Sequence, residues 1–245
     1  MNNKNIVVIT GGSRGIGASV VEVLASKGYN VCITYHSNIE KARELASKIE
    51  SLYDISTMVV KVDLRNESDI TNLFNYIYEE SYEIVALVNN AGISGSRVPL
   101  SEMNIEELRS VIDVNCIGNF LCAREAIKKM AFSYGGKGGV IVNISSLAAI
   151  TGGYHLSHYS ASKSAMISLT TSLSNEVASE GIRVNCVSPG MINTDQNKNI
   201  DNSKIQKIPL KRLGEPIEVA HVICWLISDE SSYVMGANIP VTGGL

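Results

Sequence analysis

The chain has 245 residues, 45% of them hydrophobic, and a formal net charge of −3. This length suits one α/β sheet wrapped in helices, and the apolar fraction is enough for a large core. Charges of both signs are scattered along the chain, so they leave no electrostatic footprint for nucleic acid or for an anionic membrane surface. We expect neither of these as a partner.

The N-terminal segment, MNNKNIVVITGG, has no signal-peptide pattern, and no apolar stretch approaches the roughly 18 residues of a membrane span. Five cysteines occur in apolar runs and never with C-x-x-C spacing, which indicates reduced, buried thiols rather than disulfides or zinc ligands. They are Cys32, Cys116, Cys122, Cys186 and Cys224. We expect a cytoplasmic protein with no metal site.

Short β-branched runs alternate with longer helical ones along the chain. The first three expected strands are NIVVIT, NVCITY and TMVVKVDL, and each is followed by a helical segment. EIVALVNN, GVIVNISS and IRVNCVSP follow in the second half. Such continuous apolar runs predict strands buried on both faces, as in a parallel sheet flanked by helices. We predict a single α/β domain over residues 1–245, with a doubly wound, Rossmann-type parallel sheet of about seven strands and helices on both faces.

A long helix is expected at about 104–133, before the short glycine-rich turn at 135–139. Its apolar positions recur at helical spacing and predict a buried face, covered either by the sheet or by another subunit. These positions are Leu108, Ile112, Cys116, Phe120, Ala123 and Ile127. Farther along, QNKNIDNSK at 196–204 is polar without a clear period, which is typical of a mobile loop.

The segment ITGGSRGIGASVV follows the first expected strand and opens a helix. Gly11, Gly15 and Gly17 have the spacing G-x-x-x-G-x-G, which lets the backbone turn tightly and approach a pyrophosphate at the helix N-terminus. The Walker pattern of nucleoside-triphosphate binders is absent. The segment therefore predicts a dinucleotide site, and the alternative is an ordinary glycine-rich turn.

The end of the second expected strand distinguishes the two nicotinamide dinucleotides. An acidic residue is expected there for NAD, but the chain reads TYHSN at 34–38, with no acid before Glu40. Arg14, inside the glycine loop, can meet a 2′-phosphate, with His36 and Ser37 as hydrogen-bond partners. We predict NADP(H) rather than NAD(H). The alternative for Arg14 is a solvated loop charge.

HYSASKSAM, at 158–166, places Tyr159 and Lys163 one turn apart on the same face of a helix. The pKa of a free phenol is near 10, and an ammonium about 4 Å away favours the phenolate by about 4 kcal/mol at an effective dielectric constant near 20. We therefore predict that Lys163 suffices to lower the pKa of Tyr159 toward about 7, and that an oxidised nicotinamide adds a second positive charge. His158 should point about 100° away and serve packing or the surface. Tyr154 and His155 are candidates for the wall of a substrate pocket.

Motifs in a fixed order over essentially the whole chain resemble those of the short-chain dehydrogenase/reductase family. Each motif is weak by itself, but the order and spacing of the set are specific. The matching residues are TGGSRGIG at 10–17, Asp63-Leu64, NNAG at 89–92, Asn115, Ser146, Tyr159 with Lys163, and Pro189-Gly190 with Thr194.

The resemblance implies hydride transfer between a nicotinamide and the carbonyl or secondary alcohol of a small substrate. It implies that Tyr159 is the general acid/base and that Ser146, rather than Ser145, holds the substrate oxygen. It further implies that Lys163 also binds the cofactor ribose. Asn115 is expected to interrupt the long helix and to anchor a proton-relay water. The small residues around Tyr159 and Lys163 leave room for the cofactor to lie flat.

The resemblance also assigns residues to the cofactor. Asp63 is expected to hold the adenine amino group, Asn90 to lie against a ribose, and Ile192 and Thr194 to hold the carboxamide. The full expected set is Gly11, Ser13, Arg14, Gly15, Ile16, Gly17, Tyr35, His36, Ser37, Asp63, Leu64, Asn90, Ala91, Gly92, Tyr159, Lys163, Pro189, Gly190, Ile192 and Thr194.

The substrate is less well defined by the sequence. Family members that reduce 3-oxoacyl groups on an acidic carrier protein often carry a basic residue where this chain has Glu180. Lys128, Lys129 and Lys137 can still form a basic rim. FLCAREAIKKM, IRVNCVSPG and the C-terminal GGL resemble sugar-dehydrogenase-like members. We predict a small carbonyl substrate, with 3-oxoacyl-thioester reduction (on a carrier protein or coenzyme A) as the alternative.

Two further expectations follow from the resemblance. A substrate loop is expected at about 193–212, and the chain is expected to form a homotetramer or dimer through two long helices and the last strand. An alternative function of a different class is that of a sensor or scaffold that binds a dinucleotide without catalysis. Loss of Ser146, Tyr159 or Lys163 would favour that alternative, and all three are present.

Overall fold

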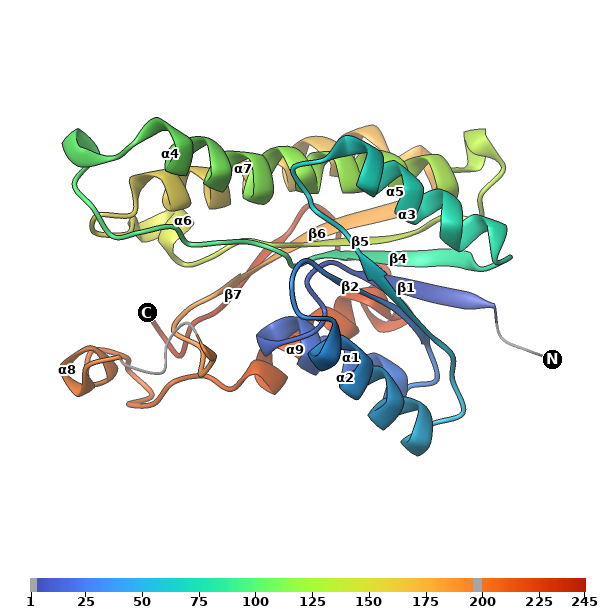
Figure 1. Ribbon diagram of the computed structural model, residues 1–245, viewed down its shortest axis with the longest axis horizontal. Coiled ribbons are helices and arrows are strands. Elements are labelled where there is room, and N and C mark those ends of the chain that lie inside the picture. Colours follow the sequence, from blue (N-terminus) through green and yellow to red (C-terminus); the bar gives the residue numbers. More distant parts are fainter. Residues whose placement is uncertain (1–3, 196–199) are drawn as a thin grey trace.

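The computed structural model describes residues 4–195 and 200–245, and its described strands form one seven-stranded sheet (Figure 1). The strand order is β3-β2-β1-β4-β5-β6-β7, and each neighbouring pair is parallel. The order reverses between β1 and β4, which is where ligands bind in open parallel sheets. The strands are β1 (Asn5–Ile9), β2 (Asn30–Tyr35), β3 (Thr57–Lys61), β4 (Glu83–Asn89), β5 (Gly139–Ile144), β6 (Ile182–Pro189) and β7 (Asn238–Val241).

Helices cover both faces of the sheet. On one face lie α1 (Gly15–Ser26), α2 (Ile39–Leu52) and α9 (Pro216–Ile227); on the other lie α3 (Glu67–Glu79), α5 (Asn119–Met130) and α7 (Ser157–Glu176) (Figure 1). Successive side chains of β1 point to opposite faces. Val7 and Ile9 belong to the core beneath the first group, and Ile6 and Val8 to the core beneath the second. All four are fully buried, which confirms the predicted doubly wound sheet with a core on each side.

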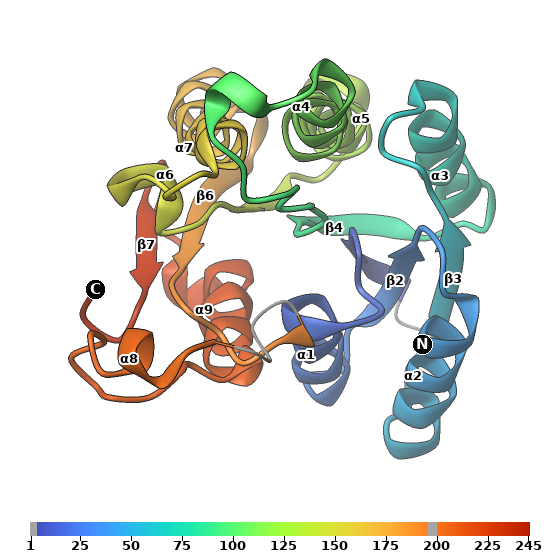
Figure 2. The same cartoon turned by 60° about the vertical axis from the view of Figure 1, so that its left-hand side comes forward.

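Several helices begin where an asparagine follows a strand or loop. Asn38 accepts the N–H of Lys41 at 2.9 Å, Asn66 that of Ser68 at 3.0 Å, and Asn104 that of Glu107 at 2.7 Å. These N-caps satisfy N–H groups that have no partner inside the helix, and so they fix where α2, α3 and α4 (Ile105–Ile112) start. The short helices α6 (Ala148–Thr151) and α8 (Asn202–Ile205) lie with α4 beyond the carboxyl ends of the strands (Figure 2).

The helix expected at 104–133 is interrupted, as the resemblance implied. It consists of α4, a π-helical turn at Asp113–Gly118, and α5. The sheet is not the main cover of the predicted face, because only Ala123 of its six positions is buried in the single chain and Phe120 is 42% exposed. Cover by another subunit stays a prediction. The true interior face lies one residue earlier and includes the fully buried Asn115 and Asn119. Since these interior positions are polar, the hydrophobic pattern pointed to the neighbouring stripe.

The other sequence expectations have mixed outcomes. The six strand runs identified in the sequence all form strands, whereas the seventh strand, NIPV at β7, was not located. Of the polar segment at 196–204, residues 196–199 lie outside the described residues, and α8 begins within the rest. All five cysteines are free, and Cys116 alone among them is only partly buried. Within the described ranges, no helix combines the length and apolarity that crossing a membrane requires.

Candidate active site

The residues predicted to bind and react meet at one edge of the sheet, beyond the carboxyl ends of the strands. The glycine loop joins β1 to α1, and His36 and Ser37 follow β2. Asp63 and Leu64 come after β3, and the segment 90–92 follows β4. Ser146 follows β5, and Pro189 ends β6. Parallel strands present these ends side by side, so residues far apart in the sequence form one candidate site.

The glycine loop is fastened to the segment after β4. The Thr10 hydroxyl accepts the N–H groups of Asn90 and Ala91, each at 2.9 Å. The Asn90 amide donates to the carbonyl oxygens of Thr10 at 2.9 Å and Gly11 at 3.2 Å. A Cβ atom at Gly17 would lie 2.4 Å from the Gly11 oxygen. The turn therefore requires glycine at this position, and Asn90 acts as a brace for the loop.

The N-terminus of α1 suits an anion. Its N-cap is Arg14, which is exposed and makes no side-chain capping bond, in contrast to the asparagine caps of α2, α3 and α4. Gly11 and Gly15 adopt positive φ angles of 62° and 55°, which side chains rarely adopt. The first N–H groups of α1 therefore lack a side-chain cap behind a tight glycine turn, and this is the arrangement that binds phosphate groups in dinucleotide sites.

A charged cluster lies beside the ends of β2 and β3. The Arg65 guanidinium donates to Asp63 from Nε at 2.9 Å and from Nη2 at 2.6 Å. These bonds hold the pKa of the Asp63 carboxyl well below its usual range. Arg65 Nη2 also lies 3.5 Å from His36 Nε2. Sequence reasoning missed Arg65, although its place two residues after Asp63 was a usable signal.

Ser146, Tyr159, Lys163 and Asn115 come together. The Ser146 hydroxyl lies close enough to the Tyr159 phenol to lower the pKa of that phenol. The buried Lys163 ammonium donates to the Ile144 carbonyl oxygen at 2.8 Å. A Cβ atom at Gly92 would lie 3.1 Å from Asn115 Oδ1 and 3.2 Å from Lys163 Nζ, so these two groups border the same glycine. The predicted quartet is therefore a spatial cluster.

Asn115 is held by the protein on all sides. It accepts the Ile93 N–H and donates to the Ile93 carbonyl oxygen, both at 2.8 Å, and it donates to the Ser162 hydroxyl at 3.0 Å. The Asn119 amide donates to the Asn115 carbonyl oxygen at 2.9 Å. Asn115 thus joins the π-helical turn to α7 and to the loop after β4. These bonds hold the turn and the loop next to Lys163.

The prediction that Lys163 by itself lowers the pKa of Tyr159 is wrong. Burial raises the pKa of the Tyr159 phenol, and the nearby Ser146 hydroxyl only partly opposes this. Burial also lowers the pKa of Lys163, to about 8, and its ammonium donates to the Ile144 carbonyl oxygen. In the chain alone, burial therefore has the largest effect on the pKa of this phenol.

The lowered pKa of Lys163 predicts a pH-dependent stability difference. Below about pH 8 the ammonium is charged in both states, and the folded chain bears the full cost of burying it. As the pH rises toward the ordinary value of 10.5, the folded state loses its proton first, so stability is gained. Relative to Lys163→Met, the unfolding free energy of the wild type should rise by about 2 kcal/mol between about pH 7.5 and about pH 9.5. Urea unfolding at both values measures this difference; a constant difference would contradict it.

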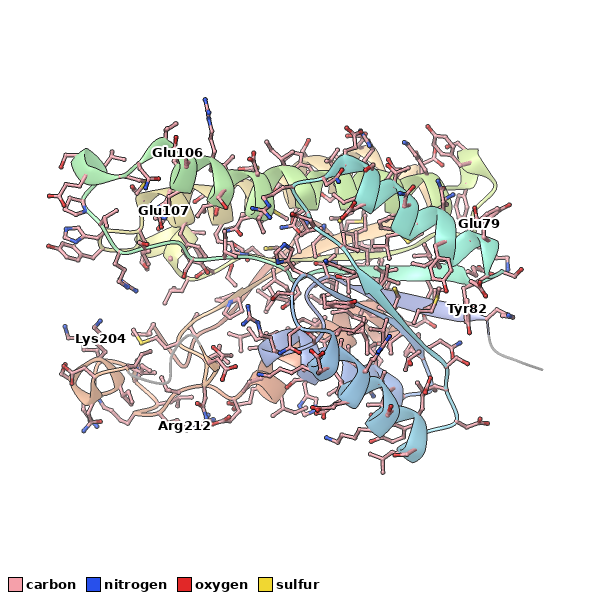
Figure 3. The ribbon with its side chains drawn as sticks, viewed as in Figure 1. Glu79, Tyr82, Glu106, Glu107, Lys204 and Arg212 are labelled. Atoms are coloured by element: carbon pink, nitrogen blue, oxygen red, sulfur yellow. The ribbon has the colours of Figure 1, made fainter. Side chains whose placement is uncertain are left out.

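The segment after β6 closes back over the glycine loop. Thr194 Cγ2 lies 3.5 Å from where a Cβ atom at Gly15 would be, and Ile192 is buried and bridges to Gly214. Both residues predicted to hold the nicotinamide carboxamide are therefore on the chain segment that borders the loop. The far end of the expected substrate loop is anchored by an ion pair of Arg212 with Glu218 at 2.7 Å. Figure 3 shows Arg212 and Lys204 at the same end of the molecule as Glu106 and Glu107 of α4.

His158 lies beneath the loop after β4, which confirms that it serves packing. It is 2% exposed, and neither ring nitrogen has a hydrogen-bond partner among the described residues. A Cβ atom at Gly95 would lie 2.3 Å from His158 Nε2, so the loop backbone rests directly on the imidazole. The N–H of Val98 donates to the His155 carbonyl oxygen at 3.1 Å. Tyr154, 80% exposed, stacks on His155.

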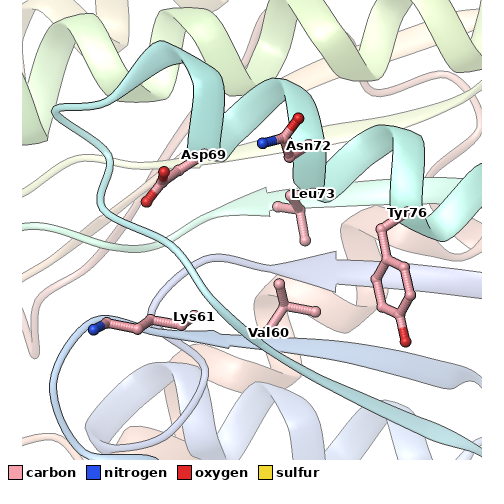
Figure 4. A pocket seen from close by; sticks show the side chains of 6 residues that line it. All are labelled: Val60, Lys61, Asp69, Asn72, Leu73 and Tyr76. Carbon is pink, nitrogen blue, oxygen red and sulfur yellow. The ribbon is translucent and has the colours of Figure 1, made fainter.

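A surface pocket of about 360 Å³ lies away from this cluster, between β3 and α3 (Figure 4). Its lining includes Lys61, Asp69 and Tyr76, and in Figure 4 Lys61 extends away from Tyr76. Asp69 accepts the backbone N–H of Asp63 at 3.1 Å. Since β3 is the edge strand, four places from β5 in the sheet, this pocket is not part of the cluster around Ser146. The Asp69 side chain in its lining helps to position Asp63.

Together, the sheet, the uncapped glycine loop and the Ser146–Tyr159–Lys163 cluster define a dinucleotide-dependent oxidoreductase fold and site. Comparisons with known proteins agree. A family model described as enoyl-(acyl carrier protein) reductase matches residues 11–245. The uncharacterized oxidoreductase YgfF of Escherichia coli is 41% identical over 247 residues, covering 98% of this chain and 99% of that protein. The chain belongs to the short-chain dehydrogenase/reductase family of oxidoreductases.

Two other similar proteins bear on the substrate. The 3-oxoacyl-(acyl-carrier-protein) reductase FabG of Aquifex aeolicus is 37% identical over 244 residues, covering 98% of this chain and 96% of that protein. The crystal structure of acetoin dehydrogenase YohF from Salmonella typhimurium has a TM-score of 0.89 and 30% sequence identity, covering 100% of this chain and 97% of that one.

Proposed function

We propose that this chain is an NADP(H)-dependent oxidoreductase that interconverts a small carbonyl compound and its secondary alcohol, with Tyr159 as the general acid/base. The Ser146 hydroxyl, close enough to the Tyr159 phenol to lower its pKa and in the same cluster as the buried Lys163, is the observation that carries this proposal. It places a proton donor and a hydrogen-bonding hydroxyl together at the edge of the sheet where the dinucleotide loop lies.

The residues present fit the cofactor. The glycine turn and the uncapped start of α1 suit its pyrophosphate, Asp63 suits the adenine, and Asn90, Lys163, Ile192 and Thr194 border the path toward Ser146. When bound, the nicotinamide supplies or accepts the hydride, and in its oxidised form it carries a positive charge. The absence of an acid after β2, where His36 stands, supports NADP(H) over NAD(H).

The chain itself handles the proton. In reduction, Tyr159 gives its phenolic proton to the substrate oxygen as the carbonyl carbon receives the hydride; in oxidation it takes that proton back. Ser146 donates a hydrogen bond to the same oxygen and stabilises the charge that develops on it. Since burial raises the pKa of Tyr159, the phenol is protonated at neutral pH and so has a proton to donate in reduction. Its use as a base requires the positive charge of the oxidised ring nearby.

A cofactor-oxidation assay tests the proposal. NADPH and NADH are each supplied with a panel of small ketones, aldehydes, 2-hydroxyketones and acyl thioesters, and kcat/KM is measured for every pair. We expect turnover of at least one small carbonyl compound, with kcat/KM for NADPH well above that for NADH. An equal or higher value with NADH would refute the cofactor assignment, and no turnover of any carbonyl compound would favour a non-catalytic dinucleotide sensor.

Reduction of 3-oxoacyl thioesters is the second candidate, favoured by the likeness to FabG. An acidic carrier protein needs a basic docking surface. The basic rim predicted from the sequence is largely engaged, however. Lys128 pairs with Glu125 at 2.8 Å, Lys137 pairs with Glu83 at 2.5 Å, and Lys129 lies 4.7 Å from the centre of the Tyr78 ring. These contacts support the small-carbonyl proposal. If the chain turned over a carrier-bound substrate faster than the coenzyme A thioester, 3-oxoacyl-thioester reduction would become the first candidate.

We also propose a homo-oligomer, a dimer or tetramer. The apolar stripe between Leu108 and Ile127, expected to be covered by the sheet or by another subunit, is partly exposed: Phe120 within it is 42% exposed, and the neighbouring Ile117 is 48% exposed. A second copy would cover these side chains. Sedimentation velocity at micromolar concentration should show an assembled species, and a purely monomeric profile would refute this part.

We further propose one domain with a substrate loop at 193–212, and a reducing, cytoplasmic location in keeping with five free cysteines.

A further inference from the structure

Arg65 lies where the adenosine ribose of a bound dinucleotide is expected. It follows β3, yet its side chain reaches the end of β2, where Nη2 is 3.5 Å from His36 Nε2. In doubly wound folds the end of the second strand faces the ribose 2′-position, with an acid there for NAD or an arginine nearby for NADP. Here His36 stands at that place, and Arg65 supplies the nearby arginine from a different strand.

The local charges make Arg65 decisive for an anion. Asp63 is paired with it, and Asp113, at the start of the π-helical turn, also attracts it. His36 Nε2 lies 3.6 Å from the Asp63 carboxylate. Without the guanidinium, the negative charges of Asp63 and Asp113 would lose this partner and would oppose an incoming phosphate, because like charges repel. Arg65 therefore neutralises the site as well as offering hydrogen bonds.

One donor group of the Arg65 guanidinium is available to a ligand. Its Nε and Nη2 are used on Asp63, whereas Nη1 has no hydrogen-bond partner in the part of the chain that the structure describes. A guanidinium can bind one carboxylate with one edge and a phosphate oxygen with its remaining N–H groups. Its side chain is about half-exposed, so an incoming ligand can reach it.

We propose that Arg65 is the specificity-determining residue for the 2′-phosphate of NADP(H), holding Asp63 on one side and the phosphate on the other. This inference rests on the proposed NADP(H) dependence and deepens it. Arg14 approaches from the glycine loop, while Arg65 and His36 approach from the ends of two strands. Removing Arg65 should therefore weaken ligands that carry a 2′-phosphate and leave those without one nearly unchanged.

Isothermal titration of the full chain with two adenosine fragments tests this without any turnover. The probes are 2′,5′-ADP, which carries the 2′-phosphate, and 5′-AMP, which lacks it. For Arg65→Gln we expect the affinity for 2′,5′-ADP to fall at least about tenfold, since one charge-assisted pair is lost, and that for 5′-AMP to change less than about twofold. Arg65→Lys keeps the positive charge but lacks the planar set of guanidinium N–H donors. Its affinity for 2′,5′-ADP should fall about threefold or more, and its affinity for 5′-AMP should not change.

Arg124→Gln is the matched control, because Arg124 is similarly exposed and paired, with Glu67 at 2.7 Å, but lies on α5. It should leave both affinities unchanged. If the wild type binds 2′,5′-ADP no more tightly than 5′-AMP, the NADP(H) assignment itself fails. If the wild type prefers 2′,5′-ADP and the Arg65 variants keep that preference, or lose both ligands equally, the inference about Arg65 is overturned while the assignment stands. Should Arg65→Gln not fold, Arg65→Lys decides by the same criterion.

Discussion

Replacing Tyr159 with phenylalanine is expected to lower kcat by about 10²–10⁴-fold, because the variant loses the proton donor while keeping the ring. The dissociation constant of NADPH should change little, since the substitution removes one hydroxyl and leaves the glycine loop intact. Steady-state assays with the best carbonyl substrate and cofactor titration by fluorescence measure the two quantities separately.

Tyr134→Phe is the control for this change. Tyr134 is 67% exposed in a short turn after α5, so the loss of its hydroxyl should leave kcat unchanged. If Tyr159→Phe retains more than about a tenth of the wild-type kcat, Tyr159 is not the general acid, because acid–base catalysis is worth more than that. A change in NADPH affinity equal to the change in kcat would assign Tyr159 to binding instead.

Replacing Gly17 with alanine is expected to impair both stability and cofactor binding. The added Cβ atom would lie 2.4 Å from the Gly11 oxygen and 2.7 Å from Asn90 Nδ2, so the glycine loop and its brace must shift. Overpacking of this kind costs about 1–3 kcal/mol of unfolding free energy. Because the displaced carbonyl belongs to the turn that approaches the pyrophosphate, NADPH affinity should fall at least about tenfold.

Gly28→Ala, at the other end of α1, separates these effects. Gly28 has a φ of 82°, so alanine is strained there, but an added Cβ atom meets nothing within 4 Å. It should cost about 1 kcal/mol of stability and leave NADPH affinity unchanged. Urea unfolding and cofactor titration on both variants decide the matter. Equal NADPH affinities for Gly17→Ala and the wild type would show that the loop does not hold the cofactor.

The sequence predicted the parts of the fold that local pattern controls. Six strands have continuous apolar runs, and each was located. β7 escaped because it is a four-residue edge strand that contains Pro240, which is atypical of a strand. The sequence left open whether the sheet or another subunit covers the apolar stripe of this interrupted helix. The face toward the sheet lies one residue earlier, where Asn115 and Asn119 form polar bonds that hydrophobicity cannot indicate.

The candidate site was predictable where residue type and order carry the chemistry, and not where distant residues meet. Tyr159, Lys163 and Ser146 were identified from such a pattern, and the structure brings them together. The contact of Arg65 with His36 and that of Gly95 with His158 join different elements, so no local spacing could indicate them. The error about Tyr159 has the same origin: the sequence gives the distance along a helix but not the burial that raises the phenol's pKa.

An ultraviolet titration of the Tyr159 phenol tests the proton-transfer step most directly. The absorbance of phenolate is followed with pH for the wild type and for Tyr159→Phe, with and without saturating NADP⁺, and the difference isolates one tyrosine. Without NADP⁺ we expect that tyrosine to ionise above the ordinary pKa of a phenol, and with NADP⁺ at a clearly lower pH. If bound NADP⁺ leaves the ionisation of Tyr159 where it was, the phenol cannot act as the base at this site.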